Sequence, residues 1–215
     1  MIIKPKLLPL PIIKLIYSVV SWYLNRRFNK LTIHPIKLNT NHSYLLMCNH
    51  FSFLDGMLAF HLCRKSGLMN ADFKGLYFMI LKKQMQMKPW LKYLGGFSVD
   101  PGKGTIGRSL NYASEILSTP GNVLLMFPQG NLESIHVRNI EIKEGINTIV
   151  PNINGNCQII WCSTIIEFFE SLQPSAHFNL LDCGTNKEFD FEKISQNINS
   201  FHKEALKKNI RFTKE

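Results

Sequence analysis

At 215 residues the chain is long enough for one α/β domain and short for two, and its 45% hydrophobic and 19% charged residues exclude an intrinsically disordered chain. The formal charge of +10 and the pI of about 9.4 favour a polyanionic partner such as nucleic acid, an anionic lipid headgroup or a phosphorylated substrate. Because the sequence has no zinc-finger spacing, RNP-type aromatic box or long basic run, nucleic acid is not expected as a partner.

Residues 1–30 are expected to be a membrane-associating segment. Residues 7–24 are strongly apolar, and the ends of this run are basic or aromatic. These end residues are Lys4, Lys6, Trp22, Tyr23, Arg26 and Arg27. Since the run is only marginally long enough for a span and contains Lys14, Pro9 and Pro11, we expect an anchor that lies on the bilayer. A helix that packs on the core of a soluble protein is the alternative, and so is a signal peptide, although no small-residue cleavage site is evident.

Short apolar runs alternate with helical patterns over residues 31–215, which predicts a single α/β domain with a largely parallel central sheet flanked by helices. The predicted strands are residues 31–36, 44–48, 123–127 and 158–162, with 178–181 as an edge or late strand. Three helices are predicted: one starts at Ser52, one spans residues 105–117, and one follows a cap at Asp190. Residues 76–94 interleave methionine, lysine and aromatic residues, which suits an acyl-chain or membrane-facing surface or ordinary core packing.

A histidine and a carboxylate lie five residues apart where the strand 44–48 meets the helix that starts at Ser52. In a continuous helix this spacing would turn the two side chains about 140° apart, so His50 and Asp55 can meet only if His50 lies in the turn before the helix. Asp55 could then fix the tautomer of the imidazole. Because no motif ties a serine or cysteine to this pair, His50 is predicted to act as general base on a substrate hydroxyl or amine.

The same residues also have a purely structural interpretation. Ser52 and Asp55 fit a capping box ahead of an apolar stretch, in which Asp55 would bind the backbone of the first helical turn. A histidine at a strand end is commonly hydrogen-bonded to the backbone. The spacing alone does not separate this interpretation from a catalytic pair.

Two further segments combine a turn with polar side chains. Residues 95–104 form a glycine-dense turn before the predicted helix 105–117, with Lys103 and Arg108 close by, and could hold an anionic group. Residues 128–134 follow the strand 123–127 and begin Pro-Gln-Gly-Asn. Since sites in open α/β sheets gather at the carboxyl ends of strands, the turns after residues 48 and 127 are predicted to converge on one pocket.

Five cysteines are present, an odd number, and none forms a CxxC pair. Most lie in apolar surroundings, so we expect buried free thiols in a reducing compartment rather than a disulfide framework or a metal site.

Taken together and in this order, the motifs of residues 31–162 resemble the glycerolipid acyltransferases of the lysophosphatidic acid acyltransferase (PlsC-like) type. The first motif of that family, NHxSxxD, is matched fully by Asn49, His50, Ser52 and Asp55. The second and third motifs are matched in part, by Gly96 and Asp100 and by Pro128, Gln129, Gly130 and Asn131.

The resemblance implies that residues 31–215 are an acyltransferase domain at the cytoplasmic face of a membrane, peripheral or monotopic. His50 would be the general base and Asp55 would orient it. The reaction would move a fatty acyl group from acyl-CoA or acyl carrier protein to the hydroxyl of a lysolipid such as 1-acylglycerol-3-phosphate. No metal or redox cofactor would be needed, and the partners would be the lipid surface, the acyl donor and the lysolipid.

The sequence departs from the family pattern where arginines are usual. Pro101 stands in place of the arginine of the second motif, and Leu132 in place of the arginine of the third. Gln129 replaces a glutamate and Asn131 a threonine. Loss of the arginines removes bidentate phosphate ligands, for which Lys103, Arg108 and Arg138 could compensate. Acylation of an aminolipid or a hydroxylated pigment, or a non-catalytic lipid-binding role on the same fold, are therefore alternatives.

Overall fold

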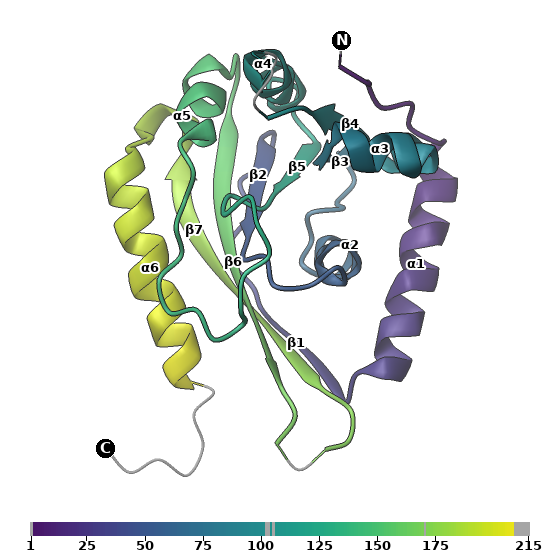
Figure 1. Cartoon of the computed structure of the whole chain (residues 1–215), viewed down its shortest axis with the longest axis vertical. Helices are drawn as coiled ribbons and strands as arrows, with labels where there is room; N and C mark the ends of the chain where they lie inside the picture. The colour runs from purple at the N-terminus through teal and green to yellow at the C-terminus, as the bar shows by residue number, and fades with distance from the viewer. Residues whose placement is uncertain (1, 102–103, 105, 170, 209–215) are drawn as a thin grey trace.

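The computed structural model describes residues 2–101, 104, 106–169 and 171–208 and contains one seven-stranded sheet with helices on both faces (Figure 1). The strand order is β1-β7-β6-β2-β5-β3-β4. The strands are β1 (Lys30–His34), β2 (Ser43–Cys48), β3 (Gly75–Leu81), β4 (Gly96–Val99), β5 (Asn122–Met126), β6 (Cys157–Glu167) and β7 (Ser175–Thr185). All neighbours are parallel except β6 and β7, which confirms the predicted single α/β domain with a largely parallel sheet.

Two helical layers cover the sheet. The α-helices are α1 (Leu10–Arg27), α2 (Asp55–Lys65), α3 (Lys82–Met87), α4 (Ile106–Leu117), α5 (Gly145–Ile149) and α6 (Phe191–Lys208). Short 3-10 helices occupy η1 (Pro89–Leu94), η2 (Val150–Asn152) and η3 (Asn186–Glu188). One core cluster joins α1 and α2 to the sheet, and a second joins α4, α5 and α6 to the other face. The predicted Asp190 cap is present, because Asp190 Oδ1 accepts from the Lys193 backbone N–H at 3.1 Å.

Strand β2 lies at the centre of the sheet, between β5 and β6, and every residue in it is buried. Its side chains alternate between the two clusters: Leu45 and Met47 pack toward α4 to α6, and Leu46 and Cys48 toward α1 and α2. A strand that is apolar on both faces is typical of a parallel sheet covered by helices. This position places the residues that follow Cys48 at the middle of the carboxyl edge.

The sequence prediction missed two strands, β3 and β4, and for β7 only one of its two alternatives, a late strand rather than an edge strand, is correct. β3 had been included in the mixed segment 76–94, because its apolar run continues into Lys82 without any turn residue. β4 lies inside the segment predicted to be a glycine-dense turn, and Gly96 is its first residue. A Cβ atom on Gly96 would lie only 2.9 Å from the Leu91 carbonyl oxygen, so this glycine serves close packing. β7 is not an edge strand, because β1 pairs with its outer side.

The N-terminal helix α1 has one face on the core and one exposed apolar face. Its buried residues are Ile13, Tyr17, Ser21 and Leu24, and its exposed hydrophobic residues are Ile12, Leu15, Val19, Trp22 and Tyr23. Pro9 is the N-cap, so the prolines do not interrupt the helix. Among the described residues, no helix combines the length and the apolar character that a bilayer crossing requires. The core packing that was the alternative is therefore present, and the predicted contact of the outer face with a membrane stays a prediction.

A buried histidine joins α1 to α2. The Nδ1 atom of His61 lies 2.8 Å from Ser21 Oγ, and burial, with smaller contributions from Lys65 and Arg64, lowers the pKa of His61 to about 4. An unfolded histidine titrates near 6.5, so the unfolded chain binds a proton between these pH values and the folded chain does not.

Acidification is therefore expected to destabilise the fold through His61. The free energy of unfolding, measured by urea titration, should fall by about 1–2 kcal/mol more between pH 7 and pH 5 than in the matched variant His61→Gln. Equal pH dependence in the two proteins would show that His61 is not held neutral in the folded state.

Candidate active site

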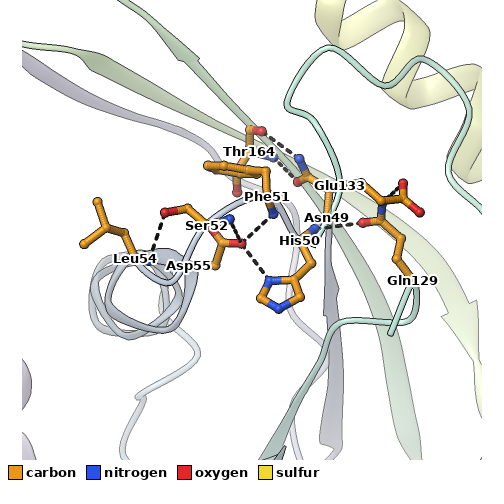
Figure 2. Close-up of polar contacts among 9 residues, drawn as sticks. All are labelled: Asn49, His50, Phe51, Ser52, Leu54, Asp55, Gln129, Glu133 and Thr164. Atoms are coloured by element: carbon orange, nitrogen blue, oxygen red, sulfur yellow. Dashed lines mark hydrogen bonds and ion pairs between the residues drawn. The ribbon is translucent and has the colours of Figure 1, made fainter. Parts of the chain in front are cut away.

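The predicted contact between His50 and Asp55 is present across the junction of β2 and α2 (Figure 2). β2 ends at Cys48, His50 lies in the following turn, and Asp55 is the first residue of α2. The distance from His50 Nδ1 to Asp55 Oδ2 is 2.8 Å. The turn thus brings together two side chains that a continuous helix would keep apart.

Asp55 also binds the backbone of the turn. The same Oδ2 atom accepts from the N–H groups of Phe51, at 2.7 Å, and Ser52, at 2.9 Å. Ser52 Oγ accepts from the Leu54 N–H at 3.1 Å. The Asp55 side chain is only 3% exposed, so its charge depends on these donors for stabilisation. The capping and the catalytic interpretations are therefore compatible, because one carboxylate fixes both the turn and the imidazole.

The imidazole of His50 is held on two sides and open on a third. Its ring stacks on Phe127 with 4.3 Å between centroids, and its side chain is 25% exposed. With Nδ1 facing Asp55, Nδ1 carries the proton and Nε2 presents a lone pair. No residue in the described parts of the chain hydrogen-bonds Nε2. A group in this state can accept a proton from a bound hydroxyl.

The turn after β5 contacts the backbone of His50 directly, as the predicted convergence requires. Gln129 Oε1 accepts from the His50 N–H at 2.7 Å, and the His50 carbonyl accepts from the Glu133 N–H at 2.9 Å. Gln129 Nε2 donates to the Glu133 carboxylate (Figure 2). Gln129 is 3% exposed, and both polar ends of its amide have partners. The residue thus positions His50 without carrying a charge of its own.

Asn49 connects the site to β6. Its Nδ2 donates to the Thr164 carbonyl at 2.9 Å, and its Oδ1 accepts from the Thr164 N–H at 2.7 Å. This reciprocal pair fixes the backbone just before His50 to the neighbouring strand. Asn49 is buried and both of its amide atoms serve this structural contact, whereas its predicted contact with substrate stays a prediction.

Helix α6 holds the long segment between β5 and α5. Asn199 binds the backbone of Ile140 through both its amide atoms, at 2.7 and 3.1 Å. His202 Nε2 donates to the Val137 carbonyl at 3.0 Å, and its Nδ1 accepts from Ser163 Oγ, also at 3.0 Å. Burial lowers the pKa of His202, which favours the neutral ring that both bonds need. The C-terminal helix therefore contributes to the shape of the site.

Lys143 is a cation beside the site that the sequence did not indicate. Its backbone N–H donates to the Pro128 carbonyl at 3.0 Å. A Cβ atom on Gly130 would lie 2.9 Å from the Lys143 amino nitrogen, and Gly130 has a φ of 72°. Glycine at residue 130 therefore permits both the turn and the approach of Lys143.

The other predicted substrate ligands do not contact the pair. Asp100 lies 3.8 Å from Lys82 across an ion pair, and Arg108, Asn131 and Arg138 are exposed. None of these four has a hydrogen bond or ion pair to His50 or Asp55 among the residues that the structure describes. Lys103 lies outside the described residues.

Four residues of the site were not singled out from the sequence: Phe127, Glu133, Lys143 and Thr164. Glu133 was the most accessible to prediction, because it follows Gln129 by four residues in the same turn. Lys143 and Thr164 reach the site through tertiary contacts that leave no local pattern.

Comparisons with known proteins concern the family and the fold. The family model described as Acyltransferase matches residues 4–162. Among solved structures, the crystal structure of the 1-acyl-sn-glycerophosphate (LPA) acyltransferase PlsC from Thermotoga maritima is similar, with a TM-score of 0.60 at 15% sequence identity. The match covers 94% of this chain and 83% of that one, and it concerns the fold. No curated protein sequence matches the chain.

Proposed function

Because the chain belongs to the acyltransferase family, we propose that it moves a fatty acyl group from an acyl thioester, acyl-CoA or acyl carrier protein, to the hydroxyl of a lysolipid such as 1-acylglycerol-3-phosphate. The observation that carries this proposal is the 2.8 Å contact between His50 Nδ1 and the buried Asp55, with Nε2 left open. This arrangement suits a base that acts on the acceptor itself. The similar Thermotoga maritima protein is a 1-acyl-sn-glycerophosphate acyltransferase, which supports such an acceptor.

The chemistry follows from the two side chains. His50 Nε2 takes the proton of the acceptor hydroxyl while the hydroxyl oxygen attacks the thioester carbonyl carbon. Asp55 stabilises the imidazolium that forms. The tetrahedral intermediate then breaks its carbon–sulfur bond, and the departing thiolate takes the proton from His50. An ester and a free thiol result, and the scheme requires neither a metal nor a redox cofactor.

A membrane location is part of the proposal. Apolar side chains surround the turn next to His50: Phe53 is 86% exposed, and Leu54 and Leu132 are also exposed. The outer face of α1 adds Trp22, over whose ring the Arg26 guanidinium lies at 4.4 Å. Such residues suit the interface of a bilayer, where a lysolipid would be available. We place residues 1–30 on that surface, at the cytoplasmic face, and residues 31–215 above it as the catalytic domain.

Lys143 is the described cation best placed to bind an acceptor phosphate. The arginines usual in the second and third motifs are absent here, whereas the Lys143 amino group lies against Gly130, next to Gln129. Lysine binds phosphate as a point charge, with less directionality than arginine.

Substitution of this lysine tests the class of acceptor. Lys143→Ala is expected to raise KM for 1-acylglycerol-3-phosphate about tenfold with kcat unchanged, and to leave KM for monoacylglycerol unchanged. Transfer from radiolabelled acyl-CoA and acyl carrier protein to both acceptors measures this. The matched control, Lys83→Ala, removes an exposed lysine on α3 and should behave as the wild type.

The same transfer assay, run with further acceptors, also distinguishes the proposal from its alternatives. Transfer to monoacylglycerol, an aminolipid or a hydroxylated pigment, with none to the phosphate-bearing acceptor, would favour the non-phosphate acceptor that the absence of both arginines suggests. Absence of product with every donor and acceptor would favour a non-catalytic lipid-binding protein, which Gln129 and Leu132 suggest.

A further inference from the structure

A hollow lies at the outer edge of the sheet, between β1, β7 and the C-terminal end of α6. Its volume is about 330 Å³. Six of its lining residues are polar: Lys30, Thr32, His34, His177, Asn179 and Lys208. No residue of the His50 site lines it. Its size is within the range of small-molecule sites.

The strand register explains why these side chains gather. β1 and β7 run parallel, with Thr32 beside His177 and His34 beside Asn179. Neighbouring residues at one level of a sheet point to the same face, and alternate residues along a strand do too. Lys30, Thr32 and His34 therefore share the face that α6 covers, and Lys208 approaches from the last turn of that helix.

The hollow is suited to an anion. Neither Lys30 nor Lys208 has a salt bridge to any residue that the structure describes, and no carboxylate is among the lining residues. The nearest carboxylate along the sheet is two strands away: Lys30 on β1 pairs with Ser175 on β7, and Ser175 pairs in turn with Glu167 on β6. The Thr32 hydroxyl is buried and lacks a hydrogen-bond partner within the described residues. Two ammonium groups with hydroxyl, imidazole and amide groups are the usual ligands of a phosphate.

The surroundings indicate where such a phosphate would come from. Phe169, which also lines the hollow, belongs to the connection between β6 and β7, whose described residues are 168, 169 and 171–174. These described residues lie beyond the ends of α1 and α6 (Figure 1). Leu172 in the same connection is 101% exposed, and Phe168 is 57% exposed. Apolar side chains at a projecting tip, next to basic groups, are typical of contact with a bilayer surface.

The tip is also joined to the end of α1. The Asn29 N–H donates to the Pro174 carbonyl at 2.8 Å, and Gln173 Nε2 donates to the Arg26 carbonyl at 3.4 Å. Arg26 and Arg27, at the end of α1, thus lie near Gln173 and Pro174 of the connection, whereas Lys30 and Lys208 line the hollow. The positive charges suit an anionic lipid surface.

We propose that this hollow binds the phosphate group of an anionic phospholipid, while Phe168 and Leu172 enter the bilayer beside it. The site is separate from the acyl-transfer site and holds a lipid that is not the acceptor. Its occupation would attach the β6–β7 connection to the membrane at a point separate from the exposed apolar face of α1.

Vesicle co-sedimentation tests the proposal without an acyl donor, so the result does not depend on acyl transfer. The double variant Lys30→Ala/Lys208→Ala is expected to bind phosphatidylcholine vesicles containing phosphatidic acid about 10- to 30-fold more weakly than the wild type. Its binding to pure phosphatidylcholine vesicles should be unchanged. Leu172→Ser is expected to weaken binding to both kinds of vesicle.

The control Lys187→Ala/Lys193→Ala removes the same charge from exposed lysines near the other end of α6 and should bind as the wild type does. Equal losses in the two double variants would overturn the proposal, because net charge would then explain binding. Binding of glycerol 3-phosphate that depends on Lys30 and Lys208, with unchanged binding to phosphatidic acid vesicles, would also overturn it in favour of a soluble phosphate ester. Thermal melts show whether each variant is folded.

Discussion

Replacement of His50 by alanine is expected to lower acyl transfer by about 10³- to 10⁴-fold, because it removes the base that accepts the proton of the attacking hydroxyl. The effect should appear in kcat, because in the proposed mechanism the ring would contact only the reacting hydroxyl of the acceptor. Initial rates with a radiolabelled acyl thioester and the best acceptor measure it.

A second variant separates catalysis from folding. His50→Asn keeps an amide donor near the position of Nδ1, so the bond to Asp55 can persist, but it places no basic nitrogen at Nε2. It should be as inactive as His50→Ala and as stable as the wild type. His42→Ala, at the other end of β2, is the histidine control and should be active. Wild-type rates in both His50 variants would end the proposed mechanism.

Asp55→Asn is expected to lower kcat by about 10²- to 10³-fold while the fold remains. An amide oxygen can still accept from the N–H groups of Phe51 and Ser52, but it has no charge with which to stabilise the imidazolium. The amide nitrogen would occupy the place of Oδ1, a buried atom without a hydrogen-bond partner in the described parts of the chain.

Asp55→Ala removes the acceptor of three hydrogen bonds at once. Besides the loss of kcat, it is expected to lower the free energy of unfolding by about 2–4 kcal/mol. Urea titration of both variants beside the kinetic assay distinguishes the two effects. Ser52→Ala is the control within the turn, because it removes only the acceptor of the Leu54 N–H. If Asp55→Asn were fully active, Asp55 would be a capping residue and nothing more.

The central strands and the His50 turn were predictable because their signals are local. β2, β5 and the first half of β6 are apolar runs bounded by polar or turn residues, and the structure places them within one residue of the predicted starts. The contact of His50 with Asp55 follows from five residues of sequence and the geometry of a helix.

The remaining features depend on contacts distant in the sequence. β3 has no turn before α3, and β4 has only four residues, so neither has the length or the boundaries that a periodicity argument needs. β1 lies beside β7, which follows it by more than a hundred residues, and the hollow between them exists only because of that pairing. Lys143 reaches Gly130 across a segment whose path is fixed by α6.

The bond between Gln129 and Glu133 changes how the third motif is understood. The carboxylate that this motif usually carries at residue 129 is present four residues later, and the neutral amide at residue 129 connects it to the backbone of His50. A glutamate restored at residue 129 would face Glu133 at hydrogen-bond distance, and two adjacent carboxylates repel each other. Residues 129 and 133 are therefore interdependent: the turn contains a carboxylate at residue 133 instead of residue 129, and the effect of a substitution at either position depends on the other.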